Sequence, residues 1–242
     1  MGYSEPFIGS EALASRAMSR GELRWNHTAL LPNIYLANGA PRDLRVRTKA
    51  AWLWTGRKGI IAGQAAAAIH TGDPLDDDAP VELIAKARRP QSGVIIRTER
   101  IDADELAAWH HMLITSPQRT ALDLARFLPR QLAICQLDRL AEQTAITEEE
   151  LYRLADRYRG ARGIDTARQV MYLMDPGAAD AAESKLRLAL HDAGLPRPET
   201  DIRVGVWPWS ARISLGWRRF KVGIHFESDP PPTDRMLINL AA

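Results

Sequence analysis

The sequence predicts a mixed α and β (α+β) protein built from two domains. Its 242 residues, 45% of them hydrophobic, are enough for a substantial core and exceed the size of a single small module. Segments with amphipathic-helix spacing alternate with short runs rich in β-branched residues. The turn Asp175-Pro176-Gly177 is the strongest internal boundary. We therefore expect a first domain over residues 1–174 and a second over residues 175–242.

Composition excludes several classes of protein. Charged residues make up 26% of the chain and the net charge is +2, so the chain is neither a disordered polyelectrolyte nor a histone-like cation. The single cysteine, Cys135, excludes a disulfide framework and a four-cysteine zinc site. No apolar stretch approaches the roughly 18 residues that span a bilayer, and the first ten residues lack a secretory signal. We expect a soluble, cytoplasmic protein with no membrane partner.

Residues 1–40 have the pattern of a helix-turn-helix followed by a wing. Ser10 is placed to cap a first helix. Ser19 starts a second helix, because Glu22 stands three residues later, as in a capping box. Residues 31–36 are expected to form a short strand, which the turn Asn38-Gly39 closes. Two closely spaced helices followed by a β-ribbon are typical of winged DNA-binding modules.

Basic residues concentrate in this part of the chain and predict DNA contacts. Arg20, Arg24 and His27 are expected on the outer face of the second helix, with Ser19 near a phosphate at its N-terminus. Four more cations follow the wing and could contact phosphates: Arg42, Arg45, Arg47 and Lys49. The alternative for both groups is an ordinary solvated surface.

The remaining elements follow from periodicity and from turn residues. Helices are expected over residues 42–54, 60–70, 117–128, 132–143, 148–158, 166–174 and 178–193. Strands are expected over residues 81–84, 94–97, 112–115, 202–206, 211–215 and 220–226. A basic run from Lys86 to Pro90 joins the first two strands.

The run Thr115-Ser116-Pro117-Gln118-Arg119-Thr120 looks like a motif, but its chemistry is that of a helix start. Ser116 or Thr115 can cap free amides, and Arg119 can pair with Asp123 one turn later. Ser116 has no evident activating base, so a nucleophile is not expected. Cys135 lies on the apolar side of its helix and is expected to pack rather than react.

Several segments together resemble one family over nearly the whole chain. They are Asn33-Ile34-Tyr35-Leu36, Ile61-Ala62-Gly63-Gln64-Ala65-Ala66-Ala67, Thr115-Ser116-Pro117-Gln118-Arg119-Thr120-Ala121, Arg159-Gly160-Ala161-Arg162-Gly163, Asp175-Pro176-Gly177 and Glu183-Ser184-Lys185-Leu186-Arg187. The chain resembles actinobacterial proteins that join an AbiEi-antitoxin-like winged helix to a very-short-patch-repair-like endonuclease domain. The resemblance implies that residues 175–242 form a small sheet of the restriction-endonuclease type.

The resemblance also implies which residues would hold Mg²⁺, and this sequence departs from that set. The helical acid of the family corresponds to Glu183, whereas Ser214 and His225 stand where strand acids are expected, and Glu227 follows. Mg²⁺ favours oxygen ligands, so serine and histidine at these positions weaken the site. A family histidine corresponds to Pro231. The family continues beyond this region, whereas the chain ends at Ala242, so we expect an incomplete and inactive nuclease domain without a cofactor.

Three hypotheses follow from the sequence. The first is a protein that binds double-stranded DNA and resembles an antitoxin and transcriptional regulator of a type IV toxin–antitoxin system, with a possible toxin partner. The second is a Mg²⁺-dependent DNA endonuclease acting through Glu183, Glu227 and His225. The third is a non-functional remnant of such an enzyme. We favour the first hypothesis. The functional site rather than the fold decides the activity, and here Ser214 and His225 replace two of the expected acids.

Overall fold

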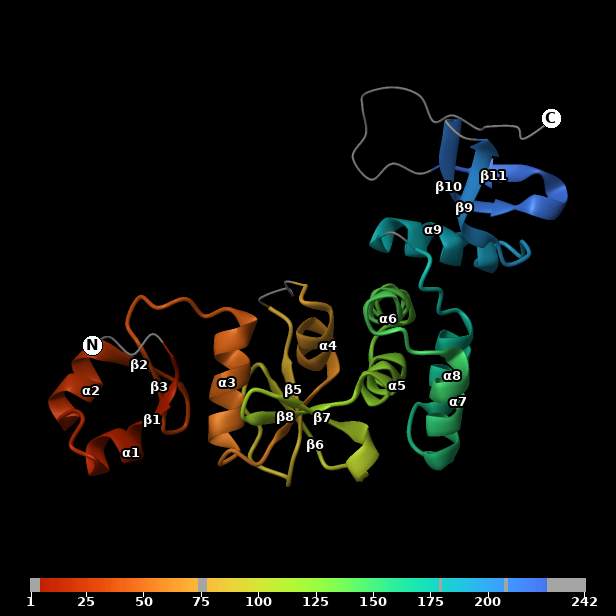
Figure 1. Cartoon of the computed structure of the whole chain (residues 1–242). Helices are drawn as coiled ribbons and strands as arrows, with labels where there is room; N and C mark the ends of the chain where they lie inside the picture. The colour runs from red at the N-terminus through yellow and green to blue at the C-terminus, as the bar shows by residue number, and fades with distance from the viewer. Residues whose placement is uncertain (1–4, 74–77, 179, 207–208, 226–242) are drawn as a thin grey trace. The chain divides into compact units, whose positions relative to one another are not determined.

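The chain forms two compact units, residues 1–123 and 124–242, in a computed structural model. The structure describes residues 5–73, 78–178, 180–206 and 209–225. Both units contain helices and strands, which confirms the mixed α and β class (Figure 1). The domain boundary expected at Asp175 stays a prediction.

The first unit begins with two short helices and a small antiparallel sheet. Its elements are β1 (Phe7–Ile8), α1 (Gly9–Ala14), α2 (Arg20–Asn26), β2 (His27–Leu31) and β3 (Ile34–Ala37). The sheet has the order β1-β3-β2, and both pairings are antiparallel. Ala12, Met18 and Leu23 form a small core beneath the helices, against Phe7 and Tyr35. We call residues 5–40 the N-terminal module.

Three details of this module differ from the sequence prediction. Ser10 does not cap α1, because Asn33 supplies the cap: the Asn33 carbonyl accepts from the Gly9 amide (2.9 Å) and its side-chain oxygen accepts from the Ser10 amide (3.0 Å). Pro32 and Asn33 form a turn, so the expected strand over residues 31–36 is a hairpin, with Asn33 at φ 65°. His27 begins β2 instead of lying on α2.

A five-stranded mixed sheet forms the rest of the first unit, in the order β6-β5-β4-β8-β7. The elements of this region are α3 (Leu44–Trp54), β4 (Ile60–Ala62), α4 (Gly63–Thr71), β5 (Val81–Ile84), β6 (Val94–Arg97), η1 (Ala103–Glu105), β7 (Leu106–Trp109) and β8 (Met112–Thr115). The helix α5 (Pro117–Phe127) begins in the first unit and ends in the second. The helix expected over residues 60–70 loses its first turn to β4, because these apolar residues pair with β5 and β8 in the middle of the sheet. The strand β7 was not predicted.

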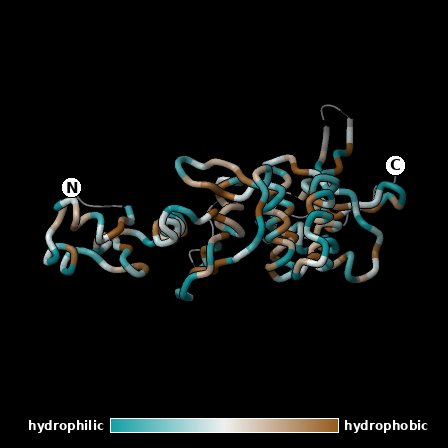
Figure 2. The backbone as a smooth tube through the Cα atoms, turned by 90° about the horizontal axis from the view of Figure 1, so that it is seen from below, coloured by the Kyte–Doolittle hydropathy of each residue, from teal (hydrophilic) through white to brown (hydrophobic). Residues whose placement is uncertain are grey.

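The second unit consists of helices followed by a three-stranded antiparallel sheet, β11-β10-β9. Its complete elements are α6 (Arg130–Thr144), α7 (Glu148–Arg157), α8 (Ile164–Tyr172), α9 (Ala181–Asp192), β9 (Glu199–Val206), β10 (Trp209–Trp217), η2 (Arg218–Phe220) and β11 (Val222–Ile224). Hydrophobic and hydrophilic residues alternate along the chain (Figure 2), as amphipathic helices require. None of the helices in the described residues is long and apolar enough to cross a membrane.

Candidate functional site

Helix α2 starts where the sequence predicts because a complete capping box closes its first turn. The Ser19 hydroxyl accepts a hydrogen bond from the Glu22 amide (3.1 Å), and the Glu22 carboxylate accepts one from the Ser19 amide (2.7 Å). Hydrogen bonding from the Ser19 backbone, and then from its side chain, lowers the pKa of Glu22. Ser19 therefore uses its amide and its hydroxyl within the capping box of its own helix, and these groups are not left for a phosphate.

The outer face of α2 carries two exposed arginines and an exposed tryptophan. Leu23 points into the core, whereas Arg20 and Arg24 face solvent. Within the described part of the chain, neither arginine forms an ion pair. The Arg24 guanidinium lies 5.6 Å from the ring centroid of Trp25, which is 74% exposed. Trp25 was not predicted from the sequence as a site residue, although its place next to Arg24 on a short helix was a usable signal.

His27, which was also expected on this face, contacts the module itself. Its ring packs edge-on against Phe7, with the centroids 5.1 Å apart. Its Nδ1 lies 3.3 Å from the carbonyl oxygen of Glu22. The half-buried imidazole thus joins α2 to the hairpin. Of the three residues predicted on the outer face of the helix, the structure brings together Arg20 and Arg24.

The four cations around α3 divide into two pairs. Arg42 and Arg45 are exposed, and Arg45 makes a loose ion pair with Glu5 (3.9 Å). Lys49 holds the same carboxylate at 2.9 Å. Arg47 donates to the carbonyl oxygen of Ala79. Arg42 and Arg45 are therefore accessible, whereas Arg47 and Lys49 are engaged in contacts that fix α3.

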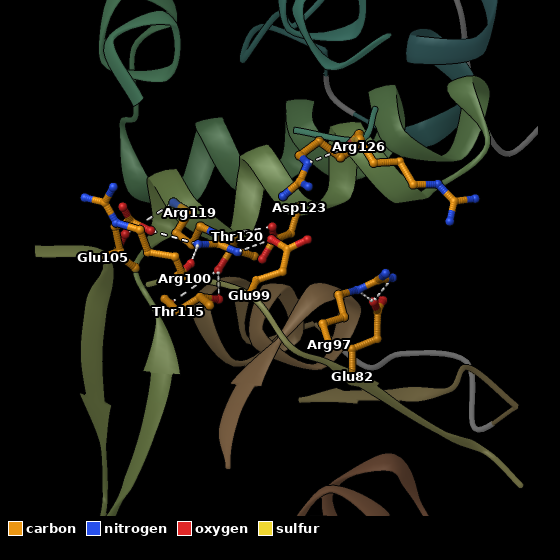
Figure 3. Close-up of polar contacts among 12 residues, drawn as sticks. Glu82, Arg97, Glu99, Arg100, Glu105, Thr115, Arg119, Thr120, Asp123 and Arg126 are labelled. Atoms are coloured by element: carbon orange, nitrogen blue, oxygen red, sulfur yellow. Dashed lines mark hydrogen bonds and ion pairs between the residues drawn. The ribbon is translucent and has the colours of Figure 1, made fainter. Parts of the chain in front are cut away.

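A second polar cluster surrounds Arg119, at the start of α5 (Figure 3). The Arg119 side chain is completely buried. Its guanidinium donates to Asp123 (3.0 Å), Glu105 (2.8 Å) and Glu99 (2.9 Å). The expected Arg119–Asp123 pair is confirmed, and so is the Ser116 cap, since the Ser116 hydroxyl accepts from the Arg119 amide (3.2 Å).

This cluster joins three segments of the first unit and has a structural role. The Arg119 guanidinium also donates to the carbonyl oxygen of Arg100 (3.0 Å), and the Ser116 amide donates to that of Glu105 (2.7 Å). The Thr115 and Thr120 hydroxyls lie 2.7 Å apart in the interior. The contacts connect α5 to the loop after β6 and to η1. They hold the chain in place and do not form an exposed catalytic surface.

Two other sequence markers also have structural explanations. Gly63 adopts φ 57°, and a Cβ there would lie 2.3 Å from a carboxylate oxygen of Glu82, which pairs with Arg97 (Figure 3). Gly163 adopts φ 78°, and a Cβ there would lie 2.8 Å from the carbonyl oxygen of Arg126. Both positions need glycine, because a side chain would add a clash to an unfavourable backbone conformation.

The predicted nuclease residues of the second unit do not form a magnesium site in the described residues. Glu183 is buried in α9, and its carboxylate faces the Arg212 guanidinium at 3.2 and 3.4 Å. Ser214 is buried in β10, whereas His225 is exposed after β11. Glu227 and Pro231 lie outside the described residues. Among the described residues of this set, Glu183 is the one carboxylate, and its negative charge is balanced by the Arg212 guanidinium rather than left for a cation.

The thiol and the acidic cluster of the chain have structural explanations as well. Burial raises the pKa of the Cys135 thiol, so little reactive thiolate forms at neutral pH. Among the described residues, Asp102, Asp104 and Glu105 are close enough to share a cation. However, Glu105 is bonded to Arg119 and Asp102 to Arg100 (2.6 Å), so the cluster is explained by internal pairing.

These observations define a protein with a small N-terminal module that exposes two arginines on one helix, an α/β region and a helical region. Comparison of sequences then shows the family. Residues 48–175, more than half of the chain, match the AbiEi antitoxin C-terminal domain, and the chain belongs to this family. Two uncharacterized proteins of Mycobacterium tuberculosis, from strains H37Rv and CDC 1551, are each 30% identical over 190 residues, which are 77% of this chain and 69% of theirs.

Proposed function

We propose that this protein is a DNA-binding regulator of the antitoxin type, and that the N-terminal module binds duplex DNA through α2. The observation that carries the proposal is the pair of exposed arginines, Arg20 and Arg24, on a capped helix that precedes a β-hairpin. Arginine is the side chain that most often reads guanine in the major groove. Membership of the AbiEi antitoxin family supports a cognate toxin protein as the second partner.

The exposure and internal contacts of the predicted DNA-binding residues support a proposal in which they have different tasks. Arg20 and Arg24 reach base edges, and Trp25 beside them packs against the backbone sugars. Arg42 and Arg45 contact phosphates, which adds affinity without sequence preference. Ser19 shapes the helix start, His27 fixes the hairpin, and Arg47 and Lys49 fix α3.

The first test is a DNA-binding titration of the full chain by fluorescence anisotropy in EDTA, with genomic fragments that include its own promoter region. Arg20→Ala with Arg24→Ala should weaken binding at least about 30-fold, because each good arginine–base contact contributes about 1–3 kcal/mol and the double variant removes two of them. The matched control is Arg139→Ala with Arg153→Ala, which removes two exposed charges from α6 and α7 that pair with Glu142 (2.6 Å) and Glu149 (3.4 Å). An unchanged affinity of the double variant for DNA would contradict the proposal.

The same titration in Mg²⁺ tests the endonuclease alternative. We expect intact DNA, because Glu183 is paired with Arg212 and Ser214 supplies no carboxylate. Cleavage that requires Mg²⁺ and disappears in Glu183→Gln would establish the nuclease hypothesis instead. A chain that neither binds nor cleaves DNA would favour the remnant hypothesis.

A further inference from the structure

Two basic loops lie at the same end of the neighbouring strands β4 and β5 in the five-stranded sheet: one leads into β4 and the other follows β5. In the antiparallel pair β4–β5, Ile60 lies opposite Ile84. Lys58 stands two residues before the first of these, and Lys86 stands two residues after the second. The ladder therefore brings both loops to one place, although they are far apart in the sequence. The strand register is fixed by the buried faces of β4 and β5 and does not depend on the charges.

The end of α3 directs the first loop to this edge. The Gly56 amide donates to Leu53 (2.9 Å) and the Arg57 amide to Trp52 (3.1 Å), which is the hydrogen-bond pattern of a Schellman motif. Gly56 adopts φ 71°, as this motif requires. From the second loop, the Arg88 guanidinium lies over the Trp54 ring, 5.4 Å from its centroid. The two loops are thus held beside each other.

The cations gathered here are exposed and have no acidic partner in the part of the chain that the structure describes. We call this group the sheet-edge patch: Lys58, Lys86, Arg88 and Arg89. Nearby cations are neutralised, since Arg57 holds Glu11 at 2.6 Å and Arg97 holds Glu82. Four like charges in neighbouring loops repel one another, and an anionic ligand relieves this repulsion.

We infer that the sheet-edge patch binds the phosphate backbone of duplex DNA, as a second contact surface in the α/β region. The patch presents cations rather than an apolar anchor, because Trp54 is half-buried beneath Arg88. This arrangement suits a regular row of phosphates and offers little to a lipid interior or to the apolar centre of a protein interface. The inference rests on the proposed function for its partner, but uses residues outside the N-terminal module.

The test neutralises the patch and measures the salt dependence of DNA binding. Lys58→Gln, Lys86→Gln and Arg89→Gln are combined, and Arg88 is kept because it packs on Trp54. Binding of the full chain to a duplex of random sequence is measured between about 50 and 200 mM KCl. Losing three phosphate contacts should make the negative slope of log affinity against log salt shallower by about 2–3 units and weaken binding at low salt by at least about tenfold.

The control removes the same total charge elsewhere in the chain. Arg139→Gln, Arg153→Gln and Lys185→Gln change helix residues of the second unit and should leave the slope unchanged. An unchanged slope in the patch variant, or an equal fall in the control, overturns the inference. So does loss of binding to a polyglutamate peptide with DNA binding intact, which identifies an acidic protein partner. All variants are compared at equal folded fraction, by far-UV circular dichroism and thermal melting.

The outcome separates this inference from the proposed function. The patch variant should weaken binding to all DNA sequences alike, whereas the Arg20→Ala, Arg24→Ala variant should lose preference among sequences. If only the module variant loses affinity, the patch inference fails and the proposed function stands. If only the patch variant loses affinity, DNA binding belongs to the α/β region and the role proposed for α2 fails.

Discussion

Arg119 of α5 is fully buried among three carboxylates, whereas Arg24 of α2 stands in solvent beside an exposed tryptophan. Both guanidiniums lie in short helices with well-formed N-terminal caps. A buried guanidinium is stable in a protein only when carboxylates and carbonyls satisfy it, and the Arg119 cluster supplies them from three segments. An exposed guanidinium is solvated by water and needs no partner in its own chain, so it is available to bind a ligand.

The comparison shows that the most motif-like run of the sequence is structural. Thr115 to Thr120 forms caps, hydrogen bonds and buried ion pairs. The arginines of α2 belong to no conspicuous run, yet both are exposed and neither forms an ion pair within the described residues. Exposure and the pairing of charges, which depend on the fold, indicate a binding role better than the sequence pattern does.

Replacing Arg119 should produce the largest effect. Arg119→Met leaves Glu105 and Asp123 buried without their guanidinium, which should lower the free energy of unfolding by about 3–5 kcal/mol. Urea titration followed by circular dichroism measures the loss. The control is Arg100→Met, whose guanidinium is 71% exposed and pairs with Asp102, with an expected loss below about 1 kcal/mol. Equal losses would show that the burial of Arg119 has no energetic consequence.

Much of the fold was predictable from local patterns. The strands β5, β6 and β8 have the predicted bounds, because each is a short apolar run between turn residues. The errors occur where a distant partner decides the local structure. Residues 60–62 directly precede a helix and were predicted to begin it, but they form the strand β4, which pairs with β5 on one side and with β8 on the other. Ser10 resembles a cap, but Asn33 from the hairpin occupies that position.

The same limit applies to the candidate sites. The Ser19 capping box and the Arg119–Asp123 pair span three and four residues, so their spacing was sufficient to predict them. The Lys49–Glu5 pair spans 44 residues of sequence and the Glu183–Arg212 pair spans 29. These partners come together only when the chain folds. A sequence pattern indicates which side chains carry a charge, whereas the tertiary structure decides which charges are already satisfied.

Removing the cap of α2 should produce an intermediate effect. Ser19→Ala leaves the Glu22 amide without its acceptor and should cost about 1 kcal/mol in unfolding free energy. The matched control is Ser10→Ala, because Ser10 does not cap α1, and its expected cost is below about 0.5 kcal/mol. A larger loss in the control would mean that the Asn33–Ser10 contact, at 2.8 Å, stabilises the module more than the capping box does.

The capping box also gives an acid dependence with a definite sign. The pKa of Glu22 is lowered from 4.5 in the folded protein, chiefly by the hydrogen bond from the Ser19 backbone. The folded state therefore favours the charged form, and this contribution is complete above the unfolded pKa. It is lost as the pH falls through the folded pKa. Glu22→Gln should flatten the acid limb of the stability curve relative to the parent, and an unchanged limb would contradict this assignment.

The smallest change in stability should come from Arg24, which makes it the sharpest test of the comparison. Arg24→Met removes an exposed charge without an ion-pair partner in the described residues, so the unfolding free energy should change by less than about 0.5 kcal/mol. Leu23→Ala, one residue earlier but in the core, should cost about 2 kcal/mol or more. Weaker DNA binding by Arg24→Met at unchanged stability would place its role in recognition, because unfolding could not explain the loss. A fall in stability comparable to that of Leu23→Ala would instead make Arg24 a structural residue, like Arg119.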